Sequence, residues 1–265
     1  KTSGPEWVPF SPDRFLRELG RSGPFSLGAE QVSAIRMVCE NGTSVMTGGP
    51  GVGKTTTLKA IVGALENAGV HVILTAPTGI AAKRASKSTN RPASTIHSAI
   101  ARLGQENEED PFIPYNCPVC LVMDETSMVN VLTMDKLLRR LPMRVSILFS
   151  GDVDQLPSIG PGRILHDLIH SGMIPVSRLQ TVYRQGPDSE IIAAAQAINR
   201  KEWPVSGKDF RIIERNGADL IQKEVIAQVD ALRRTPGFNY MKDLIILSPI
   251  KKGEAGVVAL NTELQ

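Results

Sequence analysis

The chain contains the stretch GGPGVGKTT at residues 48–56, which matches the phosphate-binding pattern G-x-x-x-x-G-K-[ST] at every position. Its glycines and proline bend the backbone so that successive N–H groups converge on phosphate oxygens, beside the positive charge of Lys54. Thr55 is expected to hold Mg²⁺ through its hydroxyl. The sequence therefore predicts a nucleoside triphosphate site, whose expected contacts are Gly49, Pro50, Gly51, Val52, Gly53, Lys54, Thr55 and Thr56.

The segments around this loop alternate between expected strands and helices. Residues 43–47 form an apolar run before the loop, and a helical stripe of apolar residues follows it at Leu58, Ile61, Val62 and Leu65. Continuous apolar runs are typical of parallel strands that are buried on both faces. We expect further strands at residues 70–76, 119–124, 144–152 and 244–248, and helices at residues 26–42 and 221–232.

The composition indicates an ordinary globular chain with a sizeable core. It has 265 residues, 42% of them hydrophobic, and its 30 basic and 27 acidic residues give a net charge of +3. This balance neither requires nor excludes a nucleic-acid partner. No apolar segment is long enough to span a bilayer, and the first ten residues lack the apolar core of a secretion signal. With only three cysteines, the expected location is the cytoplasm, with no membrane partner.

Three regions are expected along the chain. Residues 1–25 carry four prolines and one short helix, signalled by Ser11 and Pro12, and read as a linker or tether. Residues 26–180 contain the phosphate loop and most of the expected strands. Residues 181–265 resume the alternation of helix and strand, and we expect them to begin a second domain.

Two further segments carry the residues that phosphoryl transfer needs. Asp124 and Glu125 end an expected buried strand, where the aspartate is the candidate magnesium ligand and the glutamate the candidate base for the attacking water. Gln155 follows the next strand at the sheet edge where ligands bind, and is expected to sense the γ-phosphate. Arg184 is a candidate arginine finger within the chain. The expected catalytic set is Lys54, Thr55, Asp124, Glu125, Gln155 and Arg184.

These segments occur in an order that resembles the motifs of superfamily 1 DNA helicases. Within that superfamily the chain is most similar to the RecD branch, which comprises the α subunit of exodeoxyribonuclease V and its stand-alone relatives. The ending GEAGVVALNTELQ at residues 253–265 is also similar to a stretch of that branch. The other matching segments are GGPGVGKTT, TAPTGIAAKR at 75–84, STIHSAI at 94–100, VMDETSM at 122–128, FSGDVDQLPSIGPG at 149–162 and LQTVYRQ at 179–185.

The resemblance implies an α/β fold of the P-loop NTPase class. Its RecA-like parallel sheet would carry helices on both faces, and a second RecA-like domain, truncated here, would begin near residue 181. The implied activity is ATP-dependent and Mg²⁺-dependent 5′ to 3′ translocation on single-stranded DNA, with duplex unwinding at junctions during repair or recombination. Gln31 matches the glutamine that contacts adenine. The matching DNA-binding positions are Pro77, Thr78, Gly79, Lys83, Thr95 and His97.

Basic residues surround the expected DNA segment, as a phosphate backbone requires. They are Lys83, Arg84, Lys87 and Arg91, and the alternative interpretation for them is a solvated helix face. In the RecD branch a small pin that splits the duplex lies at the position of residues 103–116. Here this insertion is short and acidic, and carboxylates repel phosphates, so a wedge would have to act by steric exclusion.

Alternatives to a RecD-type motor stay open at this point. A PIF-family helicase shares the segments TGIAA and TIHS. A catalytically silent subunit with an ATPase fold could bind DNA or a partner, such as a nuclease or recombination subunit. Because the later motifs of the second domain have no counterpart in these residues, the fragment alone is expected to bind ATP but to hydrolyse it weakly.

Overall fold

The computed structural model describes residues 7, 9–22, 27–105, 112–183 and 189–264. The chain divides into two compact units, Lys1–Ile192 and Ala193–Gln265. The boundary between them lies later than the predicted one at residue 180. The assignment of the second unit to a truncated RecA-like domain stays a prediction.

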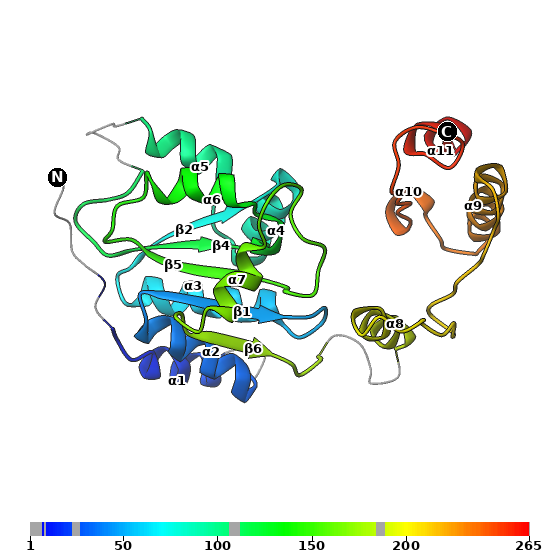
Figure 1. The fold of residues 1–265 in the computed structure, drawn as a ribbon. Coiled ribbons are helices and arrows are strands. Elements are labelled where there is room, and N and C mark those ends of the chain that lie inside the picture. The colour runs from blue at the N-terminus through cyan, green and yellow to red at the C-terminus, as the bar shows by residue number, and fades with distance from the viewer. Residues whose placement is uncertain (1–6, 8, 23–26, 106–111, 184–188, 265) are drawn as a thin grey trace. The chain divides into compact units, whose positions relative to one another are not determined.

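The first unit is built on a six-stranded sheet with the order β3-β2-β4-β5-β1-β6. All five strand pairs are parallel. This is the α/β architecture expected for a P-loop NTPase, and Figure 1 shows helices on both sides of the sheet. The strands are β1 (Thr43–Gly48), β2 (His71–Ala76), β3 (Ala93–Thr95), β4 (Val119–Met123), β5 (Ser146–Gly151) and β6 (Val176–Leu179).

The four central strands were predictable because both of their faces are buried. Along β4, for example, Cys120 and Val122 face one core, while Leu121 and Met123 face the other. The edge strands β3 and β6 were not predicted. Each is short, and β3 has no fully buried residue, so neither has a continuous apolar run.

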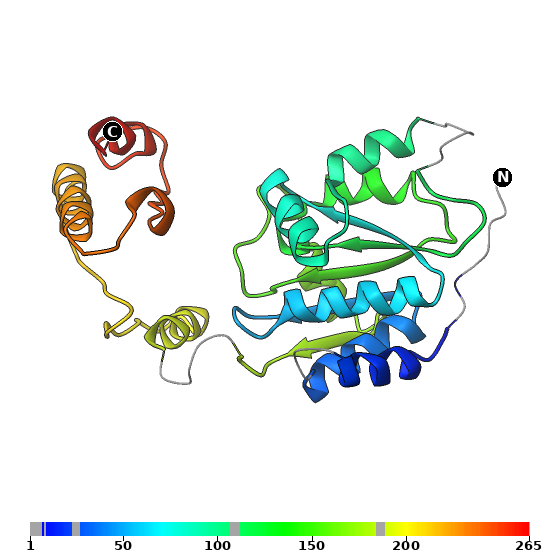
Figure 2. The same cartoon turned by 180° about the vertical axis from the view of Figure 1, so that it is seen from behind.

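Two helical layers enclose the sheet, as Figures 1 and 2 show from opposite sides. Helices α2 and α3 contribute to one core, and α5, α6 and α7 contribute to the other. The helices of this unit are α1 (Asp13–Ser22), α2 (Ala29–Glu40), α3 (Lys54–Asn67), α4 (Gly79–Thr89), α5 (Ile96–Leu103), α6 (Val131–Leu138) and α7 (Ile164–His170), with a 3₁₀ turn η1 at Thr126–Met128.

Part of the predicted N-terminal linker packs onto this unit. Helix α1 starts near the predicted position, where the Ser11 hydroxyl accepts a hydrogen bond from the Asp13 N–H at 3.3 Å. The Phe15 ring lies so close to Gly63 that a Cβ atom there would come within 2.9 Å of it. Arg36 of α2 also pairs with Asp13 at 2.5 Å. The segment therefore contributes to the core beside α3 instead of acting only as a tether.

The second unit is helical in its described residues. Helix α8 (Glu190–Asn199) crosses the boundary, and α9 (Ala218–Arg233), α10 (Tyr240–Asp243) and α11 (Val257–Leu264) follow. Arg233 connects these last three helices, because its guanidinium stacks over the Tyr240 ring and donates to the Leu264 carbonyl. Among all described helices, none combines the length and apolar character that crossing a membrane requires.

The prediction of a strand at residues 244–248 is wrong. These residues have no assigned secondary structure, and Ile245 and Leu247 are 80% and 84% exposed. A strand requires a neighbouring strand that accepts its backbone hydrogen bonds. None of the described residues of this unit forms a strand. An apolar run alone therefore does not establish a strand, because pairing with a neighbouring strand is also required.

Candidate functional site

The phosphate loop lies at the carboxyl end of β1 and leads directly into α3. Gly51 and Gly53 adopt positive φ angles of 78° and 81°, a conformation that costs a side-chain-bearing residue energy. The left-handed Gly53 is the N-cap of α3, whose first residue is Lys54. The free N–H groups at this helix N-terminus face the loop, which makes it an anion-binding site.

The Lys54 side chain turns back across this loop. Its ammonium group donates to the carbonyl oxygens of Gly48 and Gly49, the latter at 2.9 Å. Its Nζ atom also lies 4.0 Å from a carboxylate oxygen of Asp152. The charge is thus held at the mouth of the loop, where the sequence predicts the phosphates.

Asp152 is a site residue that the sequence reasoning did not single out. β5 lies between β1 and β4 in the sheet, and the carboxylate 4.0 Å from Lys54 comes from the residue that follows β5. Burial raises the pKa of Asp152, and a hydrogen bond from the Asp154 N–H partly opposes this effect. The signal was present in the sequence as the Gly151-Asp152 pair at the end of the strand expected at residues 144–152.

Asp124 and Glu125 follow β4 as predicted, and their carboxylates have different neighbours. The Ser150 hydroxyl of β5 donates to Asp124 Oδ1 at 3.0 Å. Glu125 has a φ of 53°, an uncommon backbone conformation for a residue with a side chain. Its Oε1 atom lies 4.0 Å from the Arg84 guanidinium, and its Oε2 atom is buried with no hydrogen-bond partner among the described residues.

The electrostatic surroundings of Glu125 are mixed. Burial raises the pKa of this carboxyl group above its ordinary value, and the neighbouring Asp124 raises it further. Lys54 and Arg84 oppose the shift. A partly buried carboxylate with a raised pKa and one free oxygen has the properties of a general base.

Gln31 lies beneath the loop. It is 4% exposed, its Oε1 atom accepts a hydrogen bond from the Gly28 N–H at 2.9 Å, and its Nε2 atom lies 3.5 Å from the Gly53 carbonyl. Tyr183, which the sequence reasoning passed over, is anchored through its N–H to the Gly51 carbonyl at 2.9 Å. A Cβ atom at Gly28 would collide with the Tyr183 hydroxyl. The Tyr183 ring and the Gln31 side-chain amide therefore lie beside the same part of the phosphate loop.

Lys54, Asp124 and Glu125 line a pocket of about 230 Å³, which Gln31, Tyr183 and Asp152 do not line. Thr55 and Asp124 both line it, so a hydroxyl and a carboxylate are available on one wall. Such oxygen donors are the ligands that Mg²⁺ prefers, and the donor set fits this ion. The lining residues are Gly49, Pro50, Gly51, Gly53, Lys54, Thr55, Thr56, Arg84, Ala85, Ser88, Asp124, Glu125 and Gln155.

A second pocket, of about 520 Å³, lies beyond the carboxyl ends of β2 and β3. It brings together three of the predicted DNA-binding residues, Pro77, Thr78 and His97. Thr78 and Thr95 are the N-caps of α4 and α5, and their hydroxyls accept hydrogen bonds from Ala81 and Ser98. Gly79, Lys83 and Thr95 do not line this pocket, although they lie in or beside the two helix starts.

The opposite wall of this pocket was not predicted from the sequence. It is formed by η1, the start of α6 and the loop after β5. Asn130 secures that loop, because its amide donates to the Ile159 carbonyl at 3.3 Å. Leu156 and Ile159 are 87% and 99% exposed there. Exposed aliphatic residues have no sequence signature, since an apolar residue in a loop is expected to be buried.

Gln155 lines both pockets. Its backbone N–H donates to the Asp152 carbonyl at 3.3 Å, so the residue is tied to the strand end that carries the Lys54 partner. The predicted phosphate-sensing residue therefore forms part of the boundary between the two cavities.

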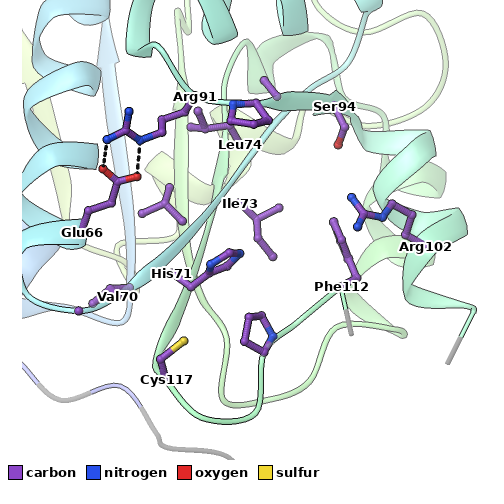
Figure 3. Close-up of a pocket in the computed structure, with 15 residues that line it drawn as sticks. Glu66, Val70, His71, Ile73, Leu74, Arg91, Ser94, Arg102, Phe112 and Cys117 are labelled. Carbon is purple, nitrogen blue, oxygen red and sulfur yellow. Dashed lines mark hydrogen bonds and ion pairs between the residues drawn. The ribbon is translucent and has the colours of Figure 1, made fainter. Parts of the chain in front are cut away.

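Among the described basic residues of the expected DNA segment, Lys83, Lys87 and Arg91 line neither of these pockets. Arg91 makes two hydrogen bonds to the carboxylate of Glu66, at 2.7 and 2.8 Å, and lines a separate pocket of about 830 Å³ with His71 and Phe112. Figure 3 shows the Arg91 guanidinium turned toward Glu66. This pocket lies beside the start of β2, away from the strand ends that carry the nucleotide residues. The predicted finger Arg184 lies outside the described residues, as does most of the acidic stretch of the 103–116 insertion.

A parallel sheet with a phosphate loop after β1 and carboxylates after β4 and β5 defines a nucleotide-binding domain of the P-loop class. A family model described as an AAA domain matches residues 26–218. The chain belongs to this family.

Relatives with similar sequences include two RecD-type proteins. The chain is 36% identical over 242 residues to the ATP-dependent RecD2 DNA helicase of Deinococcus radiodurans, with 90% of this chain and 32% of that protein covered. It is 25% identical over 277 residues to the RecBCD enzyme subunit RecD of Mycolicibacterium smegmatis, with 89% and 50% covered. The chain thus spans a third to a half of these relatives, and the resemblance to the RecD branch is confirmed.

The fold is also similar to that of solved Pif1 helicases. The Pif1 helicase from Candida albicans superposes with a TM-score of 0.53 at 20% identity, covering 77% of this chain and 55% of that one. A structure of two coordinating Pif1 helicases at forked double-stranded DNA gives a TM-score of 0.50 at 21% identity, with 78% and 58% covered. At these identities the likeness concerns the fold, and it agrees with a RecA-like sheet.

Proposed function

We propose that this chain is the ATP-binding motor portion of a RecD-type helicase, which couples ATP hydrolysis to 5′ to 3′ movement along single-stranded DNA. The observation that carries the proposal is the position of Gln155 on the boundary between the phosphate-loop pocket and the pocket that holds Thr78 and His97. Because Gln155 lines both cavities, a change in the bound nucleotide can directly alter the contacts made with the DNA strand. The similarity to the ATP-dependent RecD2 DNA helicase of Deinococcus radiodurans supports ATP and DNA as the substrates.

The chemistry assigned to the nucleotide pocket is ATP hydrolysis. Mg²⁺ bound by Thr55 and Asp124 would neutralise charge on the β- and γ-phosphates. Lys54 exchanges its bonds to the Gly48 and Gly49 carbonyls for phosphate oxygens, and Glu125 accepts the proton of the attacking water. Adenine is assigned to the corner bordered by Gln31 and Tyr183.

The pocket of about 520 Å³ that is lined by Thr78 and His97, called the strand pocket from here on, is assigned to the DNA backbone. Two helices, α4 and α5, start beside it, and their N-terminal N–H groups attract phosphates without regard to sequence. Lys83 on the exposed face of α4 adds charge nearby. The rivals are a PIF-family helicase, which the fold alone does not exclude, and a silent subunit, which the complete hydrolytic set in the sequence disfavours.

The decisive experiment compares duplexes with 5′ or 3′ single-stranded tails as substrates of the full-length protein. We expect ATP-dependent unwinding of the 5′-tailed duplex only, and ATP hydrolysis that single-stranded DNA stimulates. Unwinding from 3′ tails alone would contradict the polarity. A wild-type protein without any DNA-stimulated hydrolysis would support the silent subunit.

The strand pocket can be tested by the variant His97→Ala. We expect the Kd for single-stranded DNA to rise about five- to tenfold, because one hydrogen bond contributes roughly 1 kcal/mol and tenfold corresponds to about 1.4 kcal/mol. The loss should be similar for different DNA sequences, and ATP affinity should stay unchanged. Fluorescence anisotropy with labelled oligonucleotides measures both the size and the sequence independence of the effect.

The control for this variant is His71→Ala. His71 is also exposed, but it is the first residue of β2, whereas Pro77 and Thr78 follow the last one. It lines the pocket of Figure 3. We expect its Kd for DNA to equal that of the wild type. Equal losses for both variants would show that the predicted strand pocket is not the DNA site.

A further inference from the structure

Arg84 was grouped by sequence with the DNA-flanking basic residues, but it lies in the nucleotide pocket. Its guanidinium nitrogen Nη1 is 4.0 Å from Glu125 Oε1. The guanidinium faces the same carboxylate whose other oxygen, Oε2, is buried without a partner among the described residues. Arg84 therefore approaches Oε1, whereas Oε2 has no protein partner and, because it is buried, meets water only when the carboxylate turns.

Helix α4 connects this contact to the strand pocket. Its N-cap Thr78 lines the pocket with His97, and Arg84 lies six positions further along the same helix, a rise of about 9 Å. Ala82, Ala85 and Thr89 are buried, so the helix is anchored along one side. A short, anchored helix moves as one body, and a displacement of its N-terminus would be passed on to Arg84.

Glu125 is attached to a different element. It follows β4 and precedes η1, where the Thr126 hydroxyl donates to the Met123 carbonyl at 2.8 Å. The two partners of the 4.0 Å contact therefore belong to separate parts of the fold, α4 on one side and the end of β4 on the other. A small shift of α4 changes their separation directly.

We propose that Arg84 is a positioning residue that orients the Glu125 carboxylate and transmits occupancy of the strand pocket to the hydrolytic site. This inference rests on the proposed function. DNA bound at the start of α4 brings Arg84 into its working position, in which Oε1 of Glu125 is held and Oε2 faces the attacking water. Arg84 itself does not act on the phosphates or on the proton.

The test measures ATP hydrolysis by the full-length protein with saturating single-stranded DNA and without DNA. We expect Arg84→Ala to lower kcat with DNA about tenfold and to lower the ratio of stimulated to basal kcat at least threefold, with KM for ATP within twofold of wild type. Arg84→Lys should restore part of the ratio, because an ammonium on a shorter stem can still pair with Glu125. Lys59→Ala, which removes an exposed charge from α3, should keep the wild-type ratio.

The outcomes separate this inference from the proposed function. A wild-type protein that DNA does not stimulate refutes the function itself. If the wild type is stimulated and Arg84→Ala keeps its stimulation ratio, only the role of Arg84 is refuted. A raised KM with an unchanged ratio would make Arg84 a nucleotide ligand and would also overturn the inference. Thermal unfolding with an unchanged Tm excludes a loss of fold as the cause.

Discussion

Replacing Lys54 by alanine should reduce the ATPase activity of the full-length protein at least about a hundredfold, as loss of a preorganised electrostatic contact to the transition state does. The ammonium group is held at the mouth of the phosphate loop by the Gly48 and Gly49 carbonyls and lies 4.0 Å from Asp152. Its removal takes away the positive charge nearest to the expected phosphates. Unwinding of a 5′-tailed duplex should disappear with hydrolysis, which a coupled phosphate-release assay and a strand-displacement assay can follow in parallel.

Lys59→Ala is the matched control for this prediction. Lys59 lies on the same helix, α3, but is exposed. It should retain wild-type hydrolysis. If Lys54→Ala keeps its DNA-stimulated activity, the assignment of the phosphate loop to ATP hydrolysis is wrong, whatever the fold.

The second large effect is expected for Glu125→Gln. Glutamine has nearly the same shape but cannot accept the proton of the attacking water, and a general base contributes about 10² to 10⁴ in rate. Hydrolysis should fall by this factor while ATP binding persists. Single-turnover kinetics and equilibrium binding of a fluorescent ATP analogue distinguish a lost chemical step from a lost site.

The same substitution should not destabilise the fold. Because burial raises the pKa of Glu125, its ionised form is disfavoured in the folded state, and a neutral side chain removes that cost. We expect the Tm to stay unchanged or to rise slightly. Glu40→Gln, at the exposed end of α2, is the control and should leave kcat unchanged. A Glu125→Gln variant with wild-type kcat would show that another group activates the water.

Much of the nucleotide site could be predicted from the sequence because its residues are local to strand ends. Gly51 and Gly53 allow the positive φ angles on which the shape of the phosphate loop depends. A buried apolar strand immediately before Asp124 indicates at which end of the sheet Asp124 lies. The same reasoning failed at residues 244–248, where an apolar run forms no strand. It also did not identify Asp152 and Tyr183 as site residues, because their contacts with Lys54 and Gly51 depend on the packing of distant segments.

The separation of the basic residues was decided by the tertiary structure. In sequence, Arg84 and Arg91 belong to one positively charged run, but Arg91 is bound by Glu66 and Arg84 faces Glu125. Arg84 lies within α4 and Arg91 follows its C-cap, and each meets a carboxylate that comes from another part of the chain. Charge alone does not reveal such partners, because they are set by packing.

The sequence by itself determined the phosphate loop, the alternating strands and helices, and the relation to the RecD branch, since each depends on the order of neighbouring residues. Only the tertiary structure decided that Gln155 lies between two pockets, that β5 separates β1 from β4, and that α4 extends from the pocket lined by Thr78 to the contact between Arg84 and Glu125. The physical reason is that parallel strands align their carboxyl ends at one edge of the sheet. Segments separated by many residues meet there at hydrogen-bonding distance.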